Sequence, residues 1–350
     1  MSGRNLSAIA ILLIFSWQSY ALDANQPGAI SAPGSDTEEI EYDVYYDFTP
    51  RGNLLTKLYN PGEPIQTGLT INLPKTILGK QEIYEIKFEP EPARIFDQNG
   101  NNYAEFKFAF GHRTVKIHVH VEGKVFRYDL ATAMARGHGA AVEEPNMAVY
   151  LKAERMLECN DDLIQQLAKN ITGPNEIDVV HNIYHFVISY LDIDVSKAKG
   201  VGAAKTANSK KGMCIDYCDL FTAICRAKGI PARVVGGYQA YFHMTPKHSW
   251  VEVYLKEYGW VPFDPTQWKT TSEKDLDTMF YHLKPKYLCF THIRNDTVLN
   301  YNYYYTYPYW DKETVSKLRS FVESIEFSKP LHKKHNSLED EERTKTGKQP

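Results

Sequence analysis

The sequence is poor in cysteine and nearly neutral overall, and these two deficits exclude several classes of protein. Only five cysteines occur in 350 residues, far too few for a fold held together by disulfide bonds. They include no C-x-x-C pair, and the histidines of the one H-x-H pair, His118 and His120, have no third ligand nearby in sequence, so we expect no metal site. A net charge of -3 gives no electrostatic basis for binding nucleic acid. No Asp-rich loop of the EF-hand type occurs either, and we expect no cofactor.

Long apolar runs are also absent, apart from one short stretch at the N-terminus. Arg4 precedes an apolar run over residues 6–17, and the small-residue pattern Ser19-Tyr20-Ala21 follows it. A membrane-spanning helix needs about 20 apolar residues, so this run favours a signal peptide over residues 1–21. We expect an exported chain, periplasmic in a Gram-negative bacterium and otherwise secreted, with no integral membrane segment after cleavage. The oligomeric state stays open.

In an exported protein, an odd number of cysteines leaves at least one thiol free. The five are Cys159, Cys214, Cys218, Cys225 and Cys289. Three of them are spaced by four and seven residues, which places them along one face of a helix, where they cannot all pair with each other. A bridge between Cys159 and Cys289 remains an alternative.

The first part of the chain has the apolar pattern of β-strands. Residues 22–38 are rich in Pro, Gly, Ser and Ala, which predicts a linker, and from Ile40 the pattern has a period of two. Segments that alternate in this way lie at 42–48, 69–73, 84–88, 104–110 and 115–121. Turn signals such as Asn99-Gly100 separate them. We therefore predict an antiparallel β-sandwich domain over residues 39–148.

After residue 150 the period changes to that of helices. Asp161 and Asp162 precede one helical pattern, which Gly173-Pro174 ends, and a second pattern covers residues 177–191. These helices mark a second domain, expected over residues 149–328, with a further helix near 311–325. The charged segment 329–350 contains almost no large apolar side chains, which predicts a disordered tail.

Cys214 stands at the start of a predicted helix of this second domain. Apolar residues at 217, 220, 221 and 224 have helical spacing, and Gly229-Ile230-Pro231 ends the helix. The unpaired N–H groups and the dipole of a helix N-terminus favour negative charge, and so favour a thiolate at Cys214. We expect Cys218 and Cys225 to pack as small hydrophobic residues on the inner face of the helix.

Three predicted strands follow, and two of them carry the partners that a cysteine nucleophile needs. The strands cover residues 232–238, 249–255 and 260–266. His248 lies at the start of the second strand and Asp264 at the end of the third. If these strands form a hairpin, Asp264 can bond one imidazole nitrogen and leave the other for Cys214. His243, five residues earlier, lacks the strand pattern and is expected on a loop that lines the cleft.

This part of the chain resembles the transglutaminase-like superfamily. The matching blocks are Gly212-x-Cys214 with Asp216-Tyr217 and Leu220-Phe221, residues 229–238, His248-Ser249-Trp250-Val251-Glu252-Val253-Tyr254, and Gly259-Trp260-x-Pro262-x-Asp264-Pro265-Thr266. The resemblance implies an α+β fold: a papain-like core of helices and antiparallel sheet, here preceded by the all-β sandwich. It also implies that Cys214 is the nucleophile, His248 the base and acid, and Asp264 the orienting group.

The resemblance further implies acyl transfer through a thioester, on the amide of a protein or peptide substrate. An amine acceptor gives transamidation and water gives deamidation, while a peptidase of the same fold is the alternative. A catalytically silent exported binding protein is the third interpretation. We predict that Tyr241, His243 and Trp250 contact the substrate.

Overall fold

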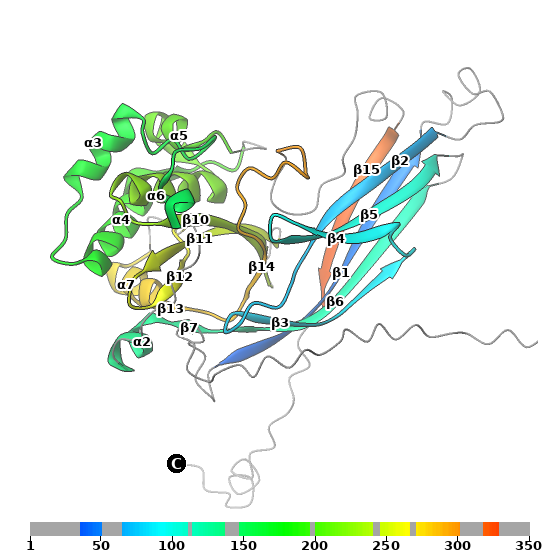
Figure 1. The fold of residues 1–350 in the computed structure, drawn as a ribbon, viewed down its shortest axis with the longest axis horizontal. Coiled ribbons are helices and arrows are strands. Elements are labelled where there is room, and N and C mark those ends of the chain that lie inside the picture. Colours follow the sequence, from blue (N-terminus) through cyan, green and yellow to red (C-terminus); the bar gives the residue numbers. More distant parts are fainter. Residues whose placement is uncertain are drawn as a thin grey trace, which may run out of the picture.

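The computed structural model describes residues 36–50, 65–110, 114–136, 147–196, 200–240, 246–266, 271–301 and 318–328. Within these ranges the chain forms a β-sandwich and a helical half built on a separate antiparallel sheet, which lie side by side in Figure 1. The expected α+β class, with an all-β part before the helical part, is confirmed.

The sandwich consists of two antiparallel sheets that share one apolar core. One sheet holds, in spatial order, β15 (Leu318–Phe327), β1 (Thr37–Pro50), β6 (Val115–Phe126) and β3 (Gln81–Glu89). The other holds β2 (Ile65–Leu73), β5 (Asn101–Phe110) and β4 (Arg94–Gln98). The alternation predicted for β1 is confirmed, because residues 40, 42, 44, 46 and 48 are all buried.

Two local features of these strands follow from backbone geometry. Asn99 and Gly100 both have positive φ, at 55° and 79°, and they form the two-residue turn that joins β4 to β5. In β3 the alternation predicted Tyr84 on the apolar face, and this was wrong. A register shift between Ile83 and Glu85 turns the side chain of Tyr84 outward, where it is 53% exposed.

The helix predicted near residues 311–325 is also wrong over its described part. Residues 318–327 form strand β15, which pairs antiparallel with β1 and lies beside it in Figure 1. Apolar residues at 318, 321, 322 and 325 have the spacing of a helix, so the local pattern favours one. The edge of β1 offers a full row of backbone partners, and this tertiary pairing outweighs the local preference. The last described strand therefore returns to the sandwich.

The helical half follows the sandwich directly. It begins with β7 (Tyr128–Asp129), α2 (Leu130–Arg136) and the short 3-10 helix η1 (Met147–Leu151). Then come α3 (Asp162–Asn170), α4 (Glu176–Tyr190), β8 (Asp192–Ile193), α5 (Ala203–Ser209), β9 (Lys211–Gly212) and α6 (Cys214–Ala227). It ends with β10 (Ala232–Gln239), β11 (Lys247–Leu255), β12 (Gly259–Phe263), α7 (Glu273–Tyr281), β13 (His282–Leu283) and β14 (Tyr287–Thr291). The helices expected after Asp161 and over 177–191 are confirmed as α3 and α4.

Helix α6 lies at the centre of this half. Twelve of its 14 residues are buried, and it packs against β10, β11 and the helices α3, α4 and α5. The sheet beneath it has the order β12-β11-β10-β14. Among the described residues, no helix combines the length and the apolar character needed to cross a bilayer.

The opposite face of this sheet packs onto the sandwich. Tyr238, Leu288 and Phe290 belong to the apolar core of the sandwich, where the ring of Tyr238 meets that of Tyr42 edge-on at 5.4 Å between centroids. Strand β10 is buried along its whole length because helices cover one face and the sandwich covers the other. The sandwich is thus part of the support for the sheet beneath α6.

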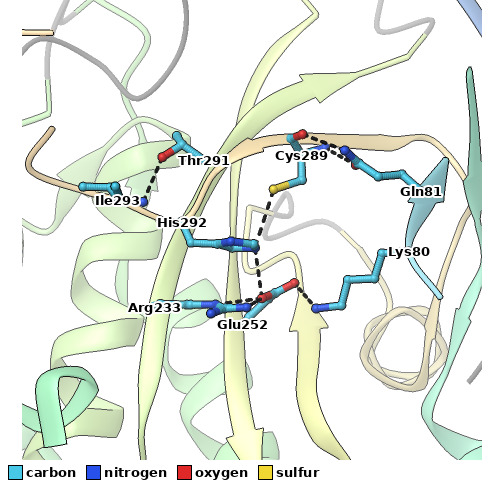
Figure 2. Close-up of polar contacts among 8 residues, drawn as sticks. All are labelled: Lys80, Gln81, Arg233, Glu252, Cys289, Thr291, His292 and Ile293. Carbon is cyan, nitrogen blue, oxygen red and sulfur yellow. Dashed lines mark hydrogen bonds and ion pairs between the residues drawn. The ribbon is translucent and has the colours of Figure 1, made fainter. Parts of the chain in front are cut away.

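A buried polar network crosses the same boundary, and Figure 2 shows it. Glu252 of β11, which is 1% exposed, pairs with Arg233 of β10 at 2.7 Å and with Lys80, the residue before β3. The side chain of Gln81 accepts the N–H of Cys289 at 2.7 Å and donates to its carbonyl at 2.9 Å. These contacts fix the orientation of the two halves through charges and hydrogen bonds as well as through apolar packing.

Candidate active site

Cys214 is the first residue of α6, and a buried carboxylate holds the backbone around it. Asp216 accepts hydrogen bonds from the N–H of Met213 at 3.0 Å and from the N–H of Val201 at 2.7 Å. At Gly212 an added Cβ would lie 2.4 Å from the Cβ of Asp216, so this close approach requires glycine. Asp216 therefore ties the segment before Cys214 to the start of the helix.

Cys214 also differs from the other cysteines in its exposure. It is partly exposed, whereas the remaining four are buried, and all five are free thiols. The alternative of a bridge between Cys159 and Cys289 is therefore not realised. Burial raises the pKa of Cys218 well above its usual range and that of Cys289 to about 12. The packing expected for Cys218 is confirmed, because its side chain is fully buried. A buried thiol with a raised pKa is inert.

His248 and Asp264 meet across the predicted hairpin. Strands β11 and β12 pair antiparallel with Val251 opposite Phe263, which brings the start of one strand to the end of the other. The Nε2 atom of His248 lies 2.9 Å from Oδ2 of Asp264, and both side chains are buried. This contact uses Nε2, so Nδ1 is the nitrogen that remains for Cys214, whose side chain is a further hydrogen-bond partner of His248.

The charges of this pair stabilise each other inside the protein. Burial alone would lower the pKa of His248, but the carboxylate of Asp264 and the side chain of Cys214 outweigh it and raise the pKa to about 10. Burial would likewise raise the pKa of Asp264, but His248, the Tyr287 hydroxyl and the N–H of Thr266 outweigh it and lower the pKa below its usual value. The arrangement therefore holds an imidazolium next to a partly exposed thiol.

Tyr287 is a residue of the site that sequence reasoning missed. Its hydroxyl donates to Oδ2 of Asp264 at 2.6 Å and accepts a hydrogen bond from Nε2 of Gln239 at 3.2 Å. Tyr287 comes from β14, and only the pairing of β14 with β10 brings it to Asp264. Nothing in the spacing of the sequence indicated this contact.

Of the three predicted substrate contacts, the structure describes one. Trp250 is 3% exposed and packs edge-on against Tyr287, with ring centroids 5.2 Å apart, so it offers little surface to a substrate. Tyr241 and His243 lie outside the described residues.

A second cysteine–histidine pair lies in the network of Figure 2. The Sγ atom of Cys289 is 3.5 Å from Nε2 of His292, and this same nitrogen is 3.3 Å from Glu252. Burial and the nearby Arg233 lower the pKa of His292 to about 4, and burial raises that of Cys289. Both groups are therefore neutral near pH 7, in contrast to His248, and this pair supports the fold.

His118 and His120, the H-x-H pair, are half-buried on the surface of the sandwich. Nε2 of His118 and Nδ1 of His120 lie 2.6 and 2.9 Å from the same oxygen of Asp43. Asp43 lies on β1 directly opposite His120 and so reaches both rings, a pairing that the pattern of a single strand does not reveal.

A cysteine at a helix start, packed against two strands that carry a histidine and a carboxylate, is the arrangement of the papain-like class of folds. Residues 165–265 match the family model of the transglutaminase-like superfamily. The resemblance stated from the sequence motifs is confirmed.

Several curated proteins are similar to this chain in sequence. A protein-glutamine gamma-glutamyltransferase of Pseudomonas aeruginosa is 38% identical over 69 residues, and an uncharacterised protein of Bacillus subtilis is 37% identical over 73. Each match covers 17% of this chain and only 10% of the relative. An uncharacterised protein of Haemophilus influenzae is 24% identical over 324 residues, covering 77% of this chain and 85% of the relative.

The fold as a whole has a solved counterpart. The crystal structure of a Cytophaga hutchinsonii protein, provisionally described as a cysteine protease, has a TM-score of 0.51 and 16% sequence identity. The similarity covers 84% of this chain and 90% of that one, so it includes the sandwich as well as the helical half.

Proposed function

We propose that this protein is a cysteine-dependent acyl-transfer enzyme that acts on an amide of a protein or peptide through a thioester intermediate. The observation that carries the proposal is the position of His248, which bonds the buried Asp264 with one nitrogen and has the side chain of Cys214 as a further partner. An imidazolium beside a thiol at a helix start favours the thiolate, which is the nucleophilic form.

In this proposal the Cys214 thiolate attacks the amide carbonyl, and the backbone N–H of Cys214 stabilises the oxyanion. His248 then donates its proton to the departing amine and becomes neutral, while Asp264 keeps the ring oriented. The proton returns to His248 when an amine or water attacks the thioester. Tyr287 acts as a positioning residue because it touches Asp264 and not the reacting atoms.

The acceptor decides the biological outcome, and the triad serves all acceptors alike. Transamidation to an amine, or deamidation by water, is the function that we propose first. It rests on the superfamily assignment and on the named activity of the P. aeruginosa relative, which shares 69 aligned residues with this chain. Peptide-bond cleavage is the second candidate, favoured by the fold shared with the C. hutchinsonii protein.

Mass spectrometry of a glutamine-containing peptide incubated with the protein and a primary amine separates these outcomes. A covalent amine adduct means transamidation, a gain of about one mass unit means deamidation, and fragments mean proteolysis. Cys214→Ala should abolish every product, whereas Cys218→Ala, one helical turn further along α6, should retain them. If wild-type protein forms no product and an alkylating probe labels Cys214 no faster than the buried cysteines, the enzymatic proposal fails and a binding role is left.

We also propose that the chain is exported, through a signal peptide at residues 1–21 that is removed after Ala21. The support is the sequence pattern of that segment, which lies outside the described residues. Expression in a Gram-negative host, followed by N-terminal sequencing of the periplasmic fraction, tests it. A mature chain that starts at Leu22 is the expected result, and an intact N-terminus in the cytoplasm would contradict export.

A further inference from the structure

Away from the triad, two histidines of α4 and one aspartate of α7 converge on a single point. We propose that His181, His185 and Asp277 form a binding site for a divalent transition-metal ion, with zinc as the best match, that links α4 to α7. Within the ranges that the structure describes, this is the one group of three His, Cys, Asp or Glu side chains whose ligand atoms all lie within 4.8 Å of one another.

The geometry is close to that of a coordinated ion. The Nε2 atoms of His181 and His185 lie 2.8 and 2.9 Å from the same oxygen, Oδ1 of Asp277. The two histidines are four residues apart and so share one face of α4, with ring centroids 4.4 Å apart. Around a tetrahedral zinc with bonds of about 2.0–2.1 Å, neighbouring ligand atoms are roughly 3.3 Å apart. If the Nε2 atom of each histidine moves about half an ångström away from Oδ1 of Asp277, the three ligand atoms leave room for the ion.

The ligand chemistry selects the kind of ion. Two imidazole nitrogens and one carboxylate oxygen suit zinc, copper, nickel or cobalt, whereas calcium and magnesium prefer sites built from oxygen atoms alone. Three protein ligands leave at least one position for water. The side chain of Asp277 is 46% exposed and those of the histidines are 24% exposed, so an ion can enter from solvent.

Packing holds the ligands in place and connects the site to the rest of the domain. The ring of Phe280 meets that of His181 edge-on at 4.8 Å and stacks on Phe263 at 4.6 Å, and Phe263 is the residue before Asp264. An ion held by α4 and α7 would therefore fix α7, the helix that follows β12 and Asp264, against α4. We expect it to stabilise the fold without taking part in the acyl transfer.

The sequence contains neither a C-x-x-C pair nor an H-x-H pair at this place. The spacing of four between His181 and His185 on a predicted helix was the available signal. Asp277 is 92 residues beyond His185, and only the packing of α7 against α4 brings it there.

Calorimetric titration with zinc chloride tests the proposal, using full-length mature protein without a histidine tag. The protein carries Cys214→Ser, so that zinc binding at the thiolate does not contribute. We expect one zinc ion per chain and a rise in the thermal unfolding temperature. His181→Gln/His185→Gln should weaken binding by more than about 100-fold, because it removes two of three ligands.

His118→Gln/His120→Gln is the matched control, since it removes another histidine pair that shares one aspartate oxygen. It should leave zinc affinity unchanged. Asp277→Asn, at an exposed position, serves as a second test variant if the double variant does not fold, and it should weaken binding at least about tenfold. Cobalt substitution should give absorption bands of nitrogen and oxygen ligands without thiolate charge transfer. Absence of a zinc-binding event, or equal zinc affinity in the variants at His181, His185 and Asp277, overturns the proposal.

Discussion

Replacing Asp264 by Asn tests the electrostatic argument for the triad most directly, because the change removes a charge and almost no volume. In the wild-type protein the carboxylate is the main group that opposes the effect of burial on His248. Without it, only the side chain of Cys214 is left to oppose the effect of burial on the imidazolium. We therefore expect the pKa of His248 to fall from about 10 to its ordinary value of 6.5 or below.

The magnitude follows from the pKa of His248. The difference between about 10 and 6.5 corresponds to roughly 5 kcal/mol in favour of the imidazolium, at about 1.4 kcal/mol per pKa unit. Because the folded pKa is raised, this contribution to stability is complete below pH 6.5 and is lost as the pH rises through about 10. Asp264 has the opposite sign: its pKa is lowered, so its contribution is lost only as the pH falls through a value below 3.8.

The assay combines histidine NMR with a measurement of acyl transfer. In the wild-type protein the His248 signal should stay that of an imidazolium between about pH 6 and pH 9. In Asp264→Asn the signal should be that of a neutral ring at neutral pH, and acyl transfer should fall by roughly 10²–10⁴-fold. Asp129→Asn, which alters a His–Asp pair outside the site, is the control. A variant whose His248 remains charged at pH 9 would refute the reasoning.

Three further substitutions test other parts of the structure. Tyr287→Phe removes one charge-assisted hydrogen bond from Asp264, so we expect turnover to fall by roughly 10-fold with little change in KM, because such a bond is worth about 1.5–3 kcal/mol. Glu252→Gln leaves a half-buried lysine and a buried arginine without their counter-charge, so urea unfolding should show a loss of about 3–5 kcal/mol. A loss below about 1 kcal/mol would contradict the importance of the network. Gly212→Ala forces a Cβ against Asp216, so labelling of Cys214 should slow while the pKa of His248, followed by NMR, stays raised.

The features that could be predicted from sequence are those that depend on neighbours along the chain. Cys214 could be placed at a helix start because the apolar spacing of α6 and its Gly-Ile-Pro end are local. His248 and Asp264 could be paired because a short turn joins their strands, and a hairpin of this kind has one natural register. The β-sandwich strands followed from their period of two for the same reason.

The features that could not be predicted depend on partners far away in sequence. The apolar spacing of residues 318–325 fits both a helix and a strand, and only the edge of β1 decides between them. Asp216 lies in a motif quoted for the family, but its role as the acceptor for N–H groups before Cys214 appears only once residues 200–213 fold over α6.

By itself, therefore, the sequence determined which residues the proposed chemistry uses: a cysteine, a histidine and an aspartate, in the order and local settings that thioester formation needs. Tertiary structure decided what surrounds that chemistry. It brought Tyr287 to Asp264 through β14, placed the sandwich against the face of the sheet opposite α6, and joined His181 and His185 to Asp277. The physical reason is the same in each case, since side-chain periodicity fixes which face of an element is buried but not which distant element covers it.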